Sequence, residues 1–180
     1  MIESKVADGK LSEGKAAESK TGGTRPVHRR ARSDYRWDGV PELPYKEDDR
    51  ALFKSITRQV LFSDPELRGE LRYFEVAAGG FSTLERHVHM HAVLILRGRG
   101  HCLIGNAVKS LETRDLVTVP PLTWHQFRAT KGEPLGFLCM VNAQRDKPQL
   151  PTAEDLARLT ADPAIAEFLG GIAAPYLSRP

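Results

Sequence analysis

The sequence has few cysteines and no long apolar segment, and each shortage excludes a class of protein. Its 180 residues include only two cysteines, Cys102 and Cys139, too few for the disulfide framework of a small secreted domain. No apolar run approaches the length of 18 or more residues that a membrane-spanning helix needs, and the first 20 residues contain no apolar stretch typical of a secretory signal. We therefore expect a protein of the reducing cytoplasm that has no membrane partner.

The net charge is small, +3, and unevenly distributed. Residues 1–24 balance four lysines against four acidic residues and offer little to bury, so they are predicted to form a disordered tail. Residues 25–54 are expected to be a basic, extended lead-in, in which 25–36 hold five arginines and one aspartate. This segment lacks a DNA-reading motif and a pattern of stacking aromatics, so nucleic acid is not the expected partner. The arginine-rich segment is expected instead to pack loosely on its own domain or on a partner subunit.

Residues 55–146 alternate short apolar segments with turn residues. The segments "SITRQVLFS" and "LRYFEVA" are separated by the turn signal "DPELRG", and similar segments rich in Val, Leu, Ile and Phe follow. Many short strands at regular spacing predict an all-β sandwich or closed barrel, and they argue against alternating strands and helices.

Residues 147–180 are predicted to form a C-terminal helical extension. Thr152, with Asp155 three residues later, has the pattern of a capped helix N-terminus. Asp162 and Pro163 then interrupt this helix and begin a second short one, with proline at its first position.

Three of the six histidines stand in one short stretch, "LERHVHMHAVLILRGRG". Glu85, His87, His89 and His91 occupy alternate positions, so in an extended strand all four side chains would face the same way. On an outward face they would simply be solvated. The segment that follows is almost wholly apolar, however, and a further histidine, His125, follows a pair of prolines. Imidazole and carboxylate groups together suit one divalent transition metal: Fe, Mn, Ni, Cu or Zn.

The same stretch resembles the first motif of the cupins, G-x5-H-x-H-x3-E-x6-G. Gly79, Glu85, His87, His91 and Gly98 match its spacing at every point, although Glu replaces the first His and His replaces the usual Glu. The cupins are small jelly-roll barrels that carry a mononuclear metal inside. The resemblance, which covers roughly residues 55–143, implies an all-β double-stranded β-helix.

The second cupin motif, G-x5-P-x-G-x2-H-x3-N, is matched less fully. Pro120 and His125 occupy its proline and histidine positions, whereas Arg114, Leu122 and Ala129 replace its Gly, Gly and Asn. The resemblance still assigns His125 a place beside the residues of the first motif.

Carried over residue by residue, the resemblance implies a metal shell of Glu85, His87, His91 and His125. His89 is the alternative to Glu85, because the motif expects histidine at position 85 and strict alternation aims His89 inward. The three-residue gap before His91, however, implies a bend or bulge that would turn His89 away. With either shell, an octahedral metal keeps one or two positions open for substrate or O2.

Three functions follow from this ligand set. The expected one is a dioxygenase that acts on a small organic molecule, because the 3-His/1-Glu set resembles that of dioxygenase cupins. The alternatives are a metal-dependent lyase or isomerase that needs no O2 and a non-catalytic ligand-binding or sensor module. Arg72 is the predicted substrate-binding residue, because an inward guanidinium can pair with a substrate carboxylate. A homodimer is expected, since small cupins commonly pair.

Overall fold

The computed structural model describes residues 27–48, 50–170 and 174–177. The predicted disordered tail, residues 1–24, lies outside these ranges. A 3-10 turn at Arg50–Leu52 precedes the main sheet. The strands are β1 Leu43–Pro44, β2 Lys54–Asp64, β3 Gly69–Phe81, β4 His91–Gly98, β5 Gly100–Ile104, β6 Ala107–Leu111, β7 Leu116–Val119, β8 His125–Ala129 and β9 Leu135–Asn142, and the helices are α1 Ala153–Thr160, α2 Pro163–Leu169 and α3 Ala174–Leu177.

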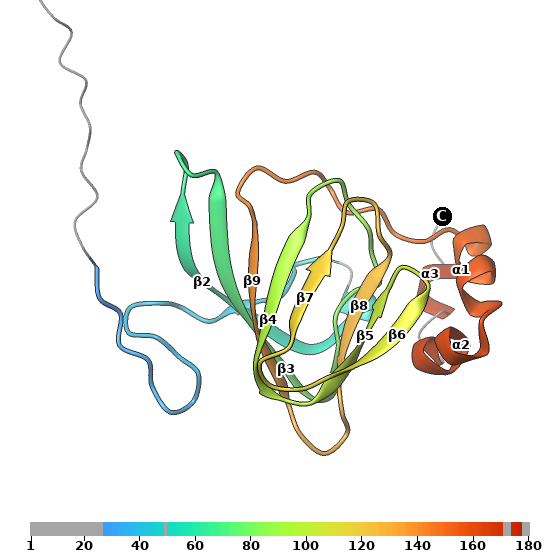
Figure 1. Cartoon of the computed structure of the whole chain (residues 1–180), viewed down its shortest axis with the longest axis horizontal. Helices are drawn as coiled ribbons and strands as arrows, with labels where there is room; N and C mark the ends of the chain where they lie inside the picture. The colour runs from blue at the N-terminus through green and yellow to red at the C-terminus, as the bar shows by residue number, and fades with distance from the viewer. Residues whose placement is uncertain (1–26, 49, 171–173, 178–180) are drawn as a thin grey trace, which may run out of the picture.

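The strands form one antiparallel sheet in the order β6-β5-β8-β3-β9-β4-β7, with β2 added along β3 and β1 along β2. The sheet curls into a jelly-roll barrel, with the short helices grouped on one side beside β5 and β6 (Figure 1). The all-β jelly roll with C-terminal helices that the sequence predicted is therefore confirmed. The predicted turn "DPELRG" joins β2 to β3, where the Asp64 side chain accepts the backbone N–H groups of Glu66 and Leu67.

Alternating side chains on β9 show how the barrel fills its interior. Phe137, Cys139 and Val141 are buried in the main core, whereas Met140 on the opposite face is exposed. Leu94 and Leu116, which pair across β4 and β7, are also exposed on the outside. The homodimer remains a prediction.

The C-terminal helices add a second core on the outside of the barrel. Thr152 caps α1 in a reciprocal capping box with Asp155, and Asp162 caps α2 with Pro163 at its first turn, as the sequence predicted. Tyr176 on α3 is buried, and its hydroxyl accepts the backbone N–H of Leu84 at 2.7 Å. None of the helices in the described part of the chain is long and apolar enough to cross a membrane.

Candidate metal centre

Three histidines reach the barrel interior from three separate elements. His91 is the first residue of β4 and His125 the first of β8, whereas His87 lies in the irregular segment between β3 and β4. The segment bends at Val88 and His89, so the alternation that would make one strand of residues 85–91 is not formed. The bend, and not strand periodicity, brings His87 to the same side as His91.

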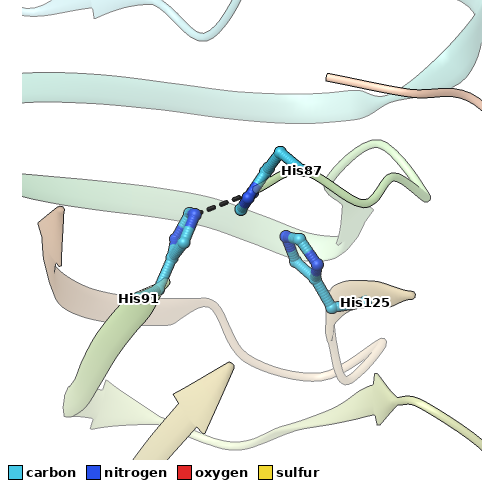
Figure 2. Close-up of side chains that lie close together, drawn as sticks. All are labelled: His87, His91 and His125. Atoms are coloured by element: carbon cyan, nitrogen blue, oxygen red, sulfur yellow. Dashed lines mark hydrogen bonds between the residues drawn. The ribbon is translucent and has the colours of Figure 1, made fainter. Parts of the chain in front are cut away.

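The three imidazole rings face a common point (Figure 2), and their ligand atoms all lie within 4.8 Å of one another. The Nε2 atoms of His87 and His91 are 2.8 Å apart. Two ligands at right angles around a metal, each at the usual 2.0–2.1 Å, would be separated by about 2.9 Å. The spacing of this pair therefore fits adjacent positions on one octahedral ion.

The Nδ1 atom of each histidine has its own partner on the side away from this point. His87 Nδ1 lies 2.7 Å from the carbonyl oxygen of His89, and His125 Nδ1 lies 2.9 Å from that of Thr123. Because a carbonyl oxygen only accepts, both Nδ1 atoms carry the proton and both Nε2 atoms present a lone pair. His91 Nδ1 contacts the Cys139 thiol at 3.1 Å. Such outer contacts are the ones that orient histidine ligands in metal sites.

Burial keeps the three histidines neutral. Burial, helped by nearby histidines with His125 foremost, lowers the pKa of His87 to about 4 and that of His91 to about 2. Burial also lowers the pKa of His125. Neutral imidazole is the form that binds a metal, so the site is prepared for one at physiological pH. The triad could therefore hold a metal ion.

The two candidates for a fourth ligand, Glu85 and His89, each pair with a charged residue outside the triad. Glu85 is buried, pairs in a β-bridge with His125 and receives the Lys46 ammonium on its carboxylate. His89 stacks on the His87 ring at 3.6 Å and points its Nδ1 at Asp146, 2.6 Å away. Both lie outside the group of three convergent histidines. A fourth ligand from Glu85 therefore remains a prediction.

Comparison with known proteins identifies the family. Residues 72–141 match the cupin domain model, Cupin_2. The 1-methylthio-D-xylulose 5-phosphate methylsulfurylase of Rhodospirillum rubrum is 61% identical over 155 residues, which cover 86% of this chain and 99% of that protein. The chain belongs to the cupin family.

Solved cupin structures support the same assignment. A cupin-2 conserved barrel protein from Rhodopseudomonas palustris is 56% identical with a TM-score of 0.75, covering 79% of this chain and 98% of that one. A cupin-2 domain protein from Rhodospirillum rubrum is 61% identical with a TM-score of 0.72, covering 83% and 99%.

The expected dioxygenase function of this cupin is wrong. The relative from Rhodospirillum rubrum is a methylsulfurylase, and its name describes no oxygenation. The three-histidine site does not decide between the two chemistries, since a metal that accepts O2 at an open position also accepts a carbonyl oxygen there. The alternative without O2 agrees better with the relative.

Three residues that the sequence did not single out for this site contact it in the folded cupin. Lys46 reaches Glu85 from the lead-in, and Asp146 holds His89 from the loop after β9. No spacing in the sequence links either pair. For Cys139, alternation with Phe137 along β9 is the signal that places its side chain inside the barrel.

An apolar cavity lies next to the triad inside the barrel. It has a volume of about 40 Å³ and borders two of the histidines, His91 and His125, together with Glu85. The rest of its wall is largely hydrophobic, with Phe74, Phe127, Phe137 and Val93 among its members. A ligand that reached the metal would therefore have an apolar recess beside it.

The stability of the metal-free cupin should fall as the pH drops below about 6.5. The folded protein keeps His87 and His91 neutral down to pKa values of about 4 and about 2, whereas the unfolded chain titrates near the usual 6.5. Below about pH 6.5 the unfolded state binds more protons than the folded state does. The stabilisation is therefore fully present above about pH 6.5 and is lost progressively as the pH falls toward the pKa values of the folded protein. Urea midpoints of chelator-treated protein from about pH 7.5 to 5 would measure this. A flat profile, or an equal fall in His91→Gln, would contradict it.

Proposed function

We propose that this cupin is a metal-dependent enzyme that releases the methylthio group of 1-methylthio-D-xylulose 5-phosphate. The observation that carries the proposal is a triad of neutral, convergent histidines beside an apolar recess, in a chain 61% identical to a methylsulfurylase over 99% of that enzyme's length. The substrate would be a small phosphorylated ketose whose methylthio group is on the carbon next to its carbonyl.

The proposed chemistry depends on that neighbouring carbonyl. A metal held by His87, His91 and His125 would act as a Lewis acid at the C2 carbonyl oxygen. C1 carries the sulfur and is bonded to C2, so the electron pair of the C1–S bond can pass onto that oxygen as an enolate when a thiol attacks the sulfur. The thiol loses its proton and takes the methylsulfanyl group as a mixed disulfide, and the enolate is protonated at C1. Glu85 is proposed as the further ligand, with the Lys46 ammonium balancing and orienting its carboxylate.

Arg72 is proposed to bind the substrate phosphate, in place of the carboxylate that the sequence suggested. It lies on the inward face of β3, beside Cys139 in the sheet, and its side chain is only 11% exposed. Its Nε donates to Glu70, which also accepts from Arg145 at 3.3 Å. Its buried Nη2 has no partner among the described residues.

Arg72 and Arg145, which both donate to Glu70, lie at a distance from the histidines that suits a short sugar phosphate. Glu70, which holds both guanidinium groups, is paired with Val141, and Val141 is paired in turn with His91. Two strand spacings, about 10 Å in total, therefore separate the backbone of Glu70 from that of His91. A ketose bound at the triad by its carbonyl could extend its phosphate toward Arg72, where charge-assisted hydrogen bonds to phosphate are strong.

Release of methanethiol tests the proposed function. Metal-loaded protein, 1-methylthio-D-xylulose 5-phosphate and an excess of a thiol as sulfur acceptor should yield methanethiol under argon as well as in air, because the excess thiol reduces the mixed methyl disulfide first formed. Without the thiol none should form. Chelation should stop the release, and restoring the metal should recover it. Protein that carries one metal per chain yet releases no methanethiol in any of these conditions would contradict the proposal.

Glutamine in place of Arg72 should lower kcat/KM for the phosphorylated substrate about 10- to 100-fold, mainly through KM. A hydrogen bond to a charged group contributes about 1.5–3 kcal/mol, which gives this range. The unphosphorylated 1-methylthio-D-xylulose should be turned over equally by both proteins. Arg97→Gln is the matched control, because it also removes a barrel-wall arginine from an ion pair, here with Glu75 at 3.3 Å. An equal loss on both substrates would show that Arg72 does not bind phosphate.

A further inference from the structure

We propose that the apolar cavity beside His91 and His125 is the subsite that receives the methylthio group, and that Val93 sets the size of group it accepts. This inference rests on the proposed function. It deepens that function because it assigns an orientation to the substrate, with its sulfur end inside the barrel and its phosphate toward Arg72.

The position of the cavity supports this orientation. His91 and Val93 are two residues apart on β4, so both point into the barrel, and Val93 is completely buried in the cavity wall. In the proposed substrate the methylthio carbon C1 is one bond from the carbonyl carbon. A carbonyl oxygen held near the Nε2 atoms of the triad therefore brings the sulfur to the entrance of the cavity.

The size of the cavity matches the group. An apolar protein cavity of about 150 Å³ holds benzene, which corresponds to about 25 Å³ for each of its six heavy atoms. On this scale the observed 40 Å³ admits about two heavy atoms. A methylthio group has two, one sulfur and one carbon, whereas a propylthio group has four.

The chemistry of the wall also fits a thioether. Phe74 stacks on Phe137 with ring centroids 5.4 Å apart, and Phe127 packs on Phe137 at 4.9 Å, so aromatic rings line one side of the cavity. Thioether sulfur makes favourable contacts with aromatic rings, and an apolar wall costs it no hydrogen bond. The hydroxyl that an ordinary ketose carries at C1 would lose its water there, so the cavity disfavours the sugar that lacks sulfur.

Alanine at position 93 should change which alkylthio group the enzyme accepts. Val93→Ala removes two methyl groups from the wall, so the ratio of kcat/KM for the 1-propylthio substrate to that for the 1-methylthio substrate should rise at least about tenfold, the lower value for one methylene in an apolar pocket. Val93→Ile fills the cavity and should lower kcat/KM for the methylthio substrate by a similar factor, with its metal content unchanged.

Val76→Ala is the control, because Val76 is completely buried in the same core but does not line the cavity. It should leave the substrate ratio unchanged even if it lowers stability. The subsite would be overturned, and the proposed function would stand, if the wild type turned over the methylthio substrate but neither variant behaved as expected. In that case Val93→Ala would keep the wild-type ratio of kcat/KM for the propylthio and methylthio substrates, and Val93→Ile would keep full activity. Metal-loaded wild-type protein that releases no methanethiol would overturn both.

Discussion

Alanine in place of His91 should remove the bound metal and lower methanethiol release about a thousandfold or more. His91 supplies one of three convergent nitrogens, and its loss leaves two imidazoles and the proposed Glu85 carboxylate, which should hold an ion much less firmly than the full set. A Lewis acid contributes several kcal/mol to such a reaction, and each 1.36 kcal/mol is a factor of ten in rate. Metal content by mass spectrometry and methanethiol release would be measured on the same sample.

His101→Ala is the matched control for this variant. His101 lies on β5 with an exposed side chain and does not belong to the convergent group. It should keep full metal content and activity. If His91→Ala retained one metal per chain, the ion would be held elsewhere and the site as described would be wrong.

The same two measurements distinguish the predicted metal shells. If Glu85 is the fourth ligand, Glu85→Ala loses metal affinity and His89→Ala keeps it. His89→Ala should keep it because His89 is already engaged by Asp146 and stacked on His87. The opposite result would place His89 in the shell and show that the bend at Val88 and His89 rearranges on metal binding.

Alanine in place of Gly98 should destabilise the fold by about 2–5 kcal/mol. Gly98 has a φ of +71°, and a Cβ at this position would overlap the backbone carbonyl of Pro134. The left-handed conformation costs an ordinary residue about 1–2 kcal/mol, and the forced shift of packed backbone adds about 1–3 kcal/mol. Urea unfolding of the metal-free protein at neutral pH would measure the change.

Gly79→Ala separates these two costs. Gly79 has nearly the same φ, +70°, but a Cβ there would meet nothing within 4 Å. It should therefore lose only the conformational cost, about 1–2 kcal/mol. Equal destabilisation of the two variants would show that the Pro134 carbonyl moves aside without cost.

These glycines show why the family motif could be recognised in the sequence. Gly79 and Gly98 stand at its two ends, and both need a backbone conformation that other residues rarely adopt. Turn chemistry of this kind is local, so the sequence displays it directly. The same holds for the Asp64 turn and for the Thr152 cap, both of which the structure confirms.

The surroundings of the histidines could not be predicted, because they depend on distant contacts. Lys46 meets Glu85 across 39 residues, and Asp146 meets His89 across 57. Strand alternation also described the histidine segment poorly, since residues 87–90 are not in a strand. Tertiary contacts set the direction of each side chain there, and local periodicity does not record them.

The reaction was beyond the sequence for a different reason. Three histidines on a barrel wall indicate a transition-metal site, but Lewis-acid chemistry and O2 chemistry use the same ligands. We propose that the difference lies in what the cavity beside the histidines admits. Its wall residues come from several strands, so their shared face becomes visible only once the barrel is closed.

The segment that carries His87 is held by residues that follow it much later in the chain. Leu84 bonds to Tyr176, 92 residues away, and Val88 bonds to Asp146, 58 residues away. At the usual rate of synthesis, about 5–20 residues per second, Tyr176 leaves the ribosome roughly 5–18 s after Leu84. A nascent chain therefore exposes its histidines before it has the frame that sets their spacing. Any preference for one metal that depends on this spacing must be exercised after translation has passed the C-terminal helices.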